Sequence, residues 1–155
     1  MTVEAGDLRE PAEPAIDLER VRGAAALALT ACDRGDAELS VTLVDDARIA
    51  ELHERYLGIP GPTDVLSFPL EDDFEGPTIL GEVVVSVDTA AREAQERGLT
   101  LERELLLYVI HGTLHLLGYD DRNPDDRARM EARQEELLEA FLSLRPRPER
   151  ERKQQ

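Results

Sequence analysis

The chain has 155 residues, of which 41% are hydrophobic, so it can bury one sizeable core and indicates a single domain. Its 34 acidic and 18 basic residues give a net charge of −16, which argues against nucleic-acid binding through a broad basic face. An enzyme that binds its substrate through a metal ion and a small basic patch stays compatible with this charge. No apolar run is long enough to cross a bilayer, no secretory leader is visible, and the single Cys32 excludes an internal disulfide, so we expect a cytoplasmic protein without a membrane partner.

Both ends of the chain lack apolar periodicity. Residues 1–15 are rich in Glu, Pro and Ala and predict a flexible N-terminal tail. Residues 145–155 are basic and interrupted by proline, and they predict a flexible C-terminal tail. Residues 16–144 then make up the predicted folded domain, and no internal repeat is visible.

The first half of this domain predicts a helix, a strand and a second helix. Asp17 can cap a helix that runs to about Ala31. Residues 38–44 alternate between apolar and polar, which is typical of a strand with one buried face. Asp45 or Asp46 can then cap a short helix, which a stretch rich in glycine and proline ends.

Two further strands and a helix follow. Residues 63–70 and 79–87 read as strands, and the short acidic connection between them favours antiparallel pairing. Asp88 can cap a helix that ends near Arg97, with Gly98 just beyond its last turn.

Two helices complete the predicted domain. Thr100 can cap a long apolar helix, and Asn123 followed by Pro124 is a strong signal for the start of the last helix. The element order favours an α+β fold in which a small mixed sheet of about four strands packs with about five helices.

The run HGTLHLLGYDD, from His111 to Asp121, contains two of the three histidines in the chain. Residues four apart on a helix point the same way, so His111 and His115 can share one ion. Gly118 can take a left-handed conformation that stops the helix and lets Asp121 return to the same ion. Two imidazoles and one carboxylate leave a coordination position open, as in a catalytic zinc site; nickel, manganese and iron also fit such ligands.

Other interpretations of this run need weighing. An isolated pair of histidines on a helix more often finds two separate polar partners, but here the preceding LLLYVI predicts a buried helix in which unpartnered imidazoles are costly. The spacing also matches a zinc-protease signature, yet that signature needs a glutamate after its first histidine and this chain has Gly112. A zinc metalloprotease is therefore the less favoured alternative. Asp120 can cap the turn or orient a ligand.

Three segments resemble those of a known family. Residues 111–120 (HGTLHLLGYD), 62–69 (PTDVLSFP) and 80–82 (LGE, before a valine-rich strand) resemble the signature segments of the bacterial YbeY endoribonucleases. The resemblance covers roughly residues 38–142, and it contains two specific motifs in the right order.

The resemblance implies a fold and a task. Members of the family are single-domain α+β proteins that bind one zinc ion and act as single-strand-specific endoribonucleases in 16S rRNA 3′-end maturation and ribosome quality control. It implies that His111, His115 and Asp121 act through zinc, with single-stranded rRNA as substrate and the small ribosomal subunit or its proteins as partner. Placement by such a partner would reconcile an acidic chain with an RNA substrate.

The chain departs from the family pattern at two positions. Asp121 stands where a histidine is usual, and the negative carboxylate should make the metal a weaker Lewis acid. Leu57 stands where an arginine is usual, and Arg55, two residues away on the helix, should face elsewhere. The alternative to the enzyme is therefore a ribosome-assembly factor with weak or no nuclease activity.

The residues do not identify a general base. Thr63, Asp64 and Ser67 can line the cleft or simply satisfy a turn. Glu82 can lie near the site or face water, and His53 is expected to be a solvated histidine on a helix face.

Overall fold

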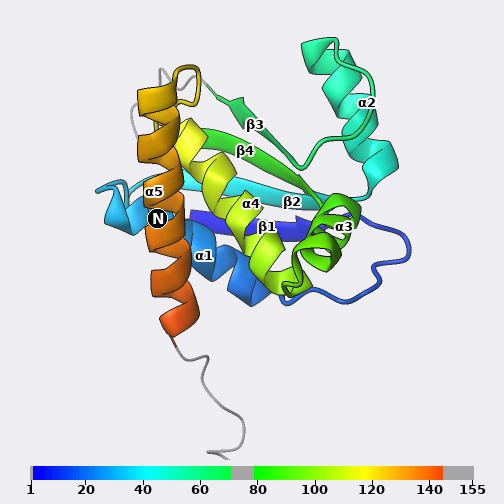
Figure 1. Ribbon diagram of the computed structural model, residues 1–155, viewed down its shortest axis with the longest axis horizontal. Helices are drawn as coiled ribbons and strands as arrows, with labels where there is room; N and C mark the ends of the chain where they lie inside the picture. Colours follow the sequence, from blue (N-terminus) through cyan, green and yellow to red (C-terminus); the bar gives the residue numbers. More distant parts are fainter. Residues whose placement is uncertain (1, 71–78, 145–155) are drawn as a thin grey trace, which may run out of the picture.

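The computed structural model describes residues 2–70 and 79–144, which form a mixed four-stranded sheet and five helices (Figure 1). This confirms the predicted α+β fold. None of the described helices is long and apolar enough to span a membrane. The strands are β1 (Thr2–Asp7), β2 (Glu38–Val44), β3 (Val65–Pro69) and β4 (Ile79–Ser86), and the helices are α1 (Leu18–Ala31), α2 (Asp46–Leu57), α3 (Val87–Arg97), α4 (Leu101–Leu116) and α5 (Pro124–Ser143).

The sheet has the strand order β1-β2-β4-β3. Strands β1, β2 and β4 are parallel, whereas β3 pairs antiparallel with β4, as the short connection between them predicts. Strand β3, which carries most of the PTDVLSFP segment, is therefore one edge of the described sheet.

The two faces of the sheet carry different cores because successive strand residues point to opposite sides. Val83 and Val85 face the main core, which α1 and α4 cover, and α5 packs on the outside of these two helices (Figure 1). Val84 and Leu66 face the other side, where Ile49 of α2 packs on them. Helix α2 thus packs on the face of the sheet opposite the main core, next to the edge strand β3.

The N-terminal residues form a strand where we predicted a flexible tail. Residues 2–7 pair with β2, with Thr2 opposite Glu38, so the tail prediction was wrong there. The loop that follows is fastened by Arg9, whose guanidinium lies 2.7 Å from an Asp7 carboxylate oxygen and donates to two backbone carbonyls. This strand has few apolar residues, so its sequence shows no clear alternation of apolar and polar positions from which a strand could be predicted. The predicted C-terminal tail, 145–155, lies outside the described residues.

Most of the predicted helix caps are confirmed, and one is wrong. Strand β4 runs straight into α3, so Ser86 is the cap and accepts the Thr89 N–H at 3.1 Å. Asp88 lies inside the first turn and instead accepts the N–H of Asp46 at 2.9 Å. The confirmed caps are Asp17, Asp45, Thr100 and Asn123.

A substitution in β1 tests whether this strand belongs to the folded unit. Val3 is 8% exposed, so Val3→Ala should lower the free energy of unfolding by about 1–2.5 kcal/mol, measured by urea denaturation. Glu4→Ala is the matched control on the exposed face and should change it by less than about 0.5 kcal/mol. An unchanged stability in Val3→Ala would mean that β1 is not part of the cooperative fold.

Candidate metal centre

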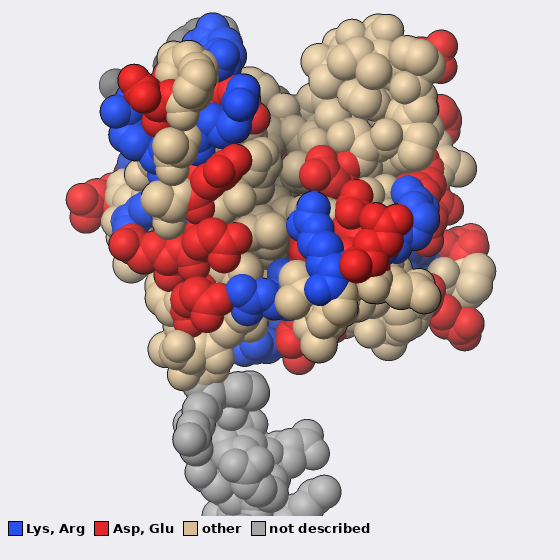
Figure 2. Space-filling view, in the orientation of Figure 1, with Lys and Arg blue, Asp and Glu red and all other residues tan. Residues whose placement is uncertain are grey.

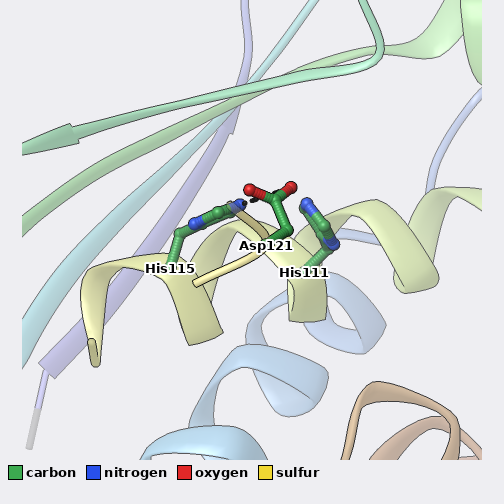
Figure 3. Close-up of side chains that lie close together, drawn as sticks. All are labelled: His111, His115 and Asp121. Atoms are coloured by element: carbon green, nitrogen blue, oxygen red, sulfur yellow. Dashed lines mark ion pairs between the residues drawn. The ribbon is translucent and has the colours of Figure 1, made fainter. Parts of the chain in front are cut away.

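Helix α4 and the turn after it bring the three predicted ligands together (Figure 3). His111 and His115 lie on one side of the helix, with ring centroids 4.7 Å apart. Gly118 has the predicted positive φ, 103°, and the Tyr119 N–H donates to the Leu114 carbonyl to close the turn. The returning chain places an Asp121 carboxylate oxygen 3.7 Å from His115 Nε2.

The donor atoms of these residues have the spacing of a metal site. One nitrogen from each histidine and one oxygen of Asp121 all lie within 4.8 Å of one another. The side chains of His115 and Asp121 are 31% and 47% exposed, so a substrate can approach them. Because three donors converge among the residues that the structure describes, an ion held by them alone would keep an open position, as catalytic rather than structural sites do.

Gln134 of α5 fixes the orientation of the first histidine. Its Oε1 lies 2.7 Å from Nδ1 of His111. An amide oxygen can only accept, so Nδ1 carries the proton and Nε2 keeps the lone pair that a metal needs. Sequence reasoning missed this residue, although Gln134 interrupts the apolar stripe formed by Met130, Leu137 and Leu138 and so had to face the interior.

The second histidine is held in the neutral form. Burial lowers the pKa of His115, the neighbouring His111 lowers it further, and the Asp121 carboxylate opposes both effects. Neutral imidazole is the form that ligates a metal, so this environment favours binding.

Gly112 lets the helix lie directly on the sheet. A Cβ at this position would be 2.6 Å from Val83 Cγ1 and 3.0 Å from Val65 Cγ2. The Gly112 carbonyl accepts the hydroxyl of Ser67 at 3.0 Å, which ties α4 to β3. The position where a zinc protease carries its glutamate base therefore has no room for a side chain, which is a physical reason against the protease alternative.

The triad opens into a cleft of about 720 Å³ between the end of α4, strand β3 and the end of α2. None of the described residues that line it is a lysine or an arginine. The cleft is lined by Tyr56, Leu57, Asp64, Val65, Leu66, Ser67, Phe68, Pro69, His111, His115, Leu116 and Asp121.

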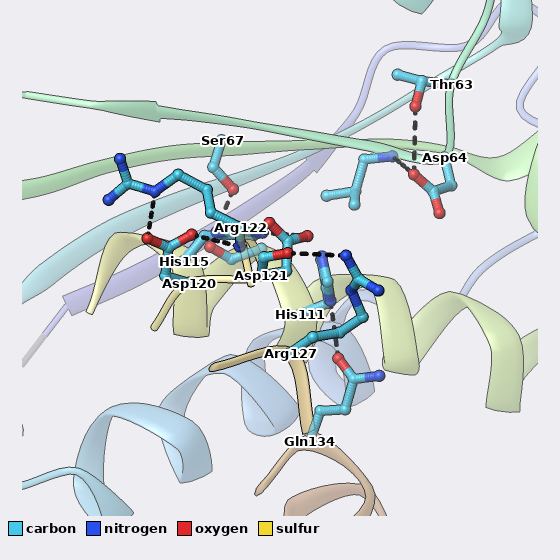
Figure 4. Close-up of polar contacts among 12 residues, drawn as sticks. Thr63, Asp64, Ser67, His111, His115, Asp120, Asp121, Arg122, Arg127 and Gln134 are labelled. Atoms are coloured by element: carbon cyan, nitrogen blue, oxygen red, sulfur yellow. Dashed lines mark hydrogen bonds and ion pairs between the residues drawn. The ribbon is translucent and has the colours of Figure 1, made fainter. Parts of the chain in front are cut away.

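Two of the candidates from the second motif reach this cleft, and both hold local structure as well (Figure 4). Ser67 ties β3 to α4 through the Gly112 carbonyl. Asp64 accepts the Val65 N–H at 2.7 Å and the Thr63 hydroxyl at 3.3 Å through the same oxygen. Thr63 itself does not line the cleft.

The other candidates lie away from the triad or serve the turn. Glu82 points to the opposite sheet face and accepts the Thr42 hydroxyl at 3.0 Å. His53 is half-buried with Nδ1 2.9 Å from the Gly61 carbonyl, so the expectation of a solvated histidine was wrong. Asp120 caps the turn by pairing with Arg122, which holds the pKa of that carboxyl below its usual range.

Comparison with known proteins assigns the family. The family model described as Endoribonuclease YbeY matches residues 14–142. The chain belongs to this family. It is 49% identical to the Endoribonuclease YbeY of Moorella thermoacetica over 137 residues, which cover 83% of this chain and 86% of that protein.

A second YbeY relative and a solved structure extend the comparison. The chain is 46% identical to the Endoribonuclease YbeY of Mycolicibacterium gilvum over 117 residues, which are 69% of this chain but only 65% of that relative's length. The solution structure of TM1509 from Thermotoga maritima superposes with a TM-score of 0.64 at 30% identity, covering 90% of this chain and 89% of that one. The fold of this YbeY chain is therefore that of a known structure.

The contact between Gln134 and His111 predicts a measurable effect on metal affinity. Gln134→Leu removes the acceptor, so the affinity for Zn²⁺, measured by competition with a chromogenic chelator, should fall about 10- to 100-fold. Gln134→Glu keeps an acceptor and should retain most of the affinity. Equal affinity in the leucine variant and the unaltered protein would contradict the orienting role.

Proposed function

We propose that this YbeY chain is a zinc-dependent, single-strand-specific endoribonuclease that acts in the cytoplasm in 16S rRNA 3′-end maturation and ribosome quality control. The observation that carries the proposal is the convergence of His111, His115 and Asp121 at an open cleft. The relatives named endoribonuclease support the reaction class. The substrate is single-stranded rRNA, and the partner is the small ribosomal subunit or its proteins.

The residues present fit a zinc ion. Two imidazole nitrogens and one carboxylate oxygen are ordinary zinc ligands, and the Gln134 contact leaves Nε2 of His111 available. When bound, zinc supplies polarisation of a phosphate oxygen and activation of water. His115 contributes a neutral ring, and Asp121 contributes the negative charge that partly offsets that of the ion.

The cleft itself supports a single-stranded substrate. Its volume, about 720 Å³, is in the range of sites for small ligands, so it admits a nucleotide or two of an extended strand. His111 and His115 line the same cleft, so a phosphate of such a strand can lie beside them.

Arg127 of α5 is a basic side chain that lies beside Asp121 of the triad (Figure 4). It contacts the Asp121 carbonyl at 3.4 Å and forms no ion pair with any residue in the described part of the chain. Arg122 and Arg129, by contrast, are each paired with a carboxylate at 2.5 Å. We therefore assign Arg127 the role of contacting the phosphate backbone, which a chain of net charge −16 needs.

This role predicts different effects for two neighbouring arginines. Arg127→Ala should lower kcat/KM on a single-stranded RNA about five- to tenfold. It should also reduce the slope of the logarithm of the binding constant against the logarithm of the salt concentration by about one. Arg129→Ala, on the same helix but paired with Asp126, should leave both nearly unchanged. Equal effects in the two variants would show that only general charge matters.

Cleavage of RNA by zinc-loaded protein tests the enzyme proposal. The unaltered protein should cut a single-stranded RNA and spare its duplex form. His115→Ala removes a metal ligand itself, so it should lower the rate by more than about 100-fold, which is more than the loss of a residue that only orients a ligand typically costs. Cleavage that survives His115→Ala would come from a contaminating ribonuclease.

The alternative is a ribosome-assembly factor with weak or no nuclease activity. The observation that favours it is Leu57, which is 57% exposed at the cleft, where no basic side chain of the described residues lines the wall. A protein with one zinc per chain that binds small ribosomal subunits but never cuts RNA would establish this alternative and contradict the enzyme.

A further inference from the structure

The end of α2 forms a second, aromatic wall of the cleft. Tyr56 is 58% exposed and lies in the last turn of the helix, before Gly58 ends it with a φ of 70°. Its ring meets Phe68 edge-on, with centroids 5.3 Å apart. The Arg55 guanidinium lies over the ring at 5.6 Å from the centroid. The ring is thus held by two neighbours and still offers much of its surface to solvent.

The edge strand β3 connects this wall to the metal centre. Ser67 points to α4, where it binds the Gly112 carbonyl beside His111. The next residue, Phe68, points to the opposite side and packs with α2. The cleft therefore crosses the sheet edge, with the triad at one end and Tyr56 at the other.

The two ends of the cleft differ in chemistry. The end at His111, His115 and Asp121 is polar, whereas Tyr56, Leu57 and Phe68 are apolar. Figure 2 shows a hollow between α2 and the N-terminal end of α5 whose walls are mostly uncharged, although charged side chains surround it. A ligand that fits both ends carries an anionic group and a flat apolar group a short distance apart.

A nucleotide of single-stranded RNA has this composition. We propose that Tyr56 is a stacking platform for a nucleobase of the RNA strand whose phosphate lies at the triad. Exposed aromatic rings bind unpaired bases in this way, and every base offers a flat face, so the contact is tolerant of sequence. The stack requires an unpaired base, so it gives the chain a physical means of selecting single strands. The inference rests on the proposed function, because it assumes RNA at the triad.

Binding without cleavage tests the platform. A fluorescein-labelled 2′-O-methyl RNA decamer, checked by gel to stay intact, is titrated with zinc-loaded protein and followed by anisotropy. Tyr56→Leu keeps apolar volume but removes the aromatic face, and it should weaken binding at least about fivefold, the lower end for losing one base stack. Tyr56→Phe should bind within about twofold of the unaltered protein.

Two controls separate stacking from other effects of the substitution. Ile59→Ala alters another exposed apolar side chain, 49% exposed and not part of the cleft lining, and should leave binding unchanged. Urea denaturation of Tyr56→Leu should show one cooperative transition, which establishes that the variant is folded, and the phenylalanine variant keeps the packing on Phe68.

Decamers with one abasic nucleotide at successive positions identify the base. One position should weaken binding to the unaltered protein by the same factor as Tyr56→Leu, and the loss should fall below about twofold in that variant, because the two changes remove one interaction. Unchanged binding of the decamer by Tyr56→Leu would overturn the platform. So would independent effects at every position, in which the loss from the abasic nucleotide multiplies the loss from Tyr56→Leu.

Further outcomes separate this proposal from its alternatives. If Tyr56→Leu no longer binds small ribosomal subunits but binds the decamer as tightly as the unaltered protein, the ring contacts a protein and the proposal is wrong. If the decamer shows the coupling but zinc-loaded protein never cuts the unmodified RNA, the platform stands and the nuclease proposal fails.

Discussion

The close contact of α4 with strands β3 and β4 at Gly112 is the constraint on which the site depends. A methyl group there would lie 2.6 Å from a valine carbon of β4, so the helix and the sheet meet without a side chain between them. Because His111 precedes this contact and Ser67 is tied to the Gly112 carbonyl, the ligands lie at the sheet edge, in reach of the cleft. A bulkier residue would move the helix away and separate the histidines from the strand that forms the opposite wall.

Three other features complete the site around this contact. The turn at Gly118 returns Asp121 to the histidines, Gln134 of α5 fixes the ring of His111, and the end of α2 closes the far side of the cleft. The acidic character of the chain fits this arrangement, since the charges lie around the cleft and leave most of its walls apolar (Figure 2). Recognition of RNA would then depend on a few local contacts instead of a broad basic face.

Local signals predicted much of the fold and the three residues that converge at the candidate metal centre. The pair of histidines could be placed because their spacing is a property of one helix, and Asp121 because a glycine precedes it at a helix end. The apolar stripe of α5 could place Gln134 toward the interior, but not its contact with His111, because the two residues are 23 apart in sequence and lie on different helices. Strand β1 was missed because its pairing with β2 supplies what its own pattern lacks, and Asp88 was misplaced because β4 continues into α3 without a loop.

We propose that His111, His115 and Asp121 bind one catalytic metal ion, with His111 oriented by Gln134. A crystal structure of the zinc-loaded protein, with anomalous scattering recorded at the zinc edge, tests it directly. We expect one strong anomalous peak bonded to Nε2 of both histidines and to the Asp121 carboxylate, with the His111–Gln134 hydrogen bond kept and one position open to the cleft. A peak elsewhere, coordination through Nδ1 of His111, or a fourth protein ligand closing the site would contradict it.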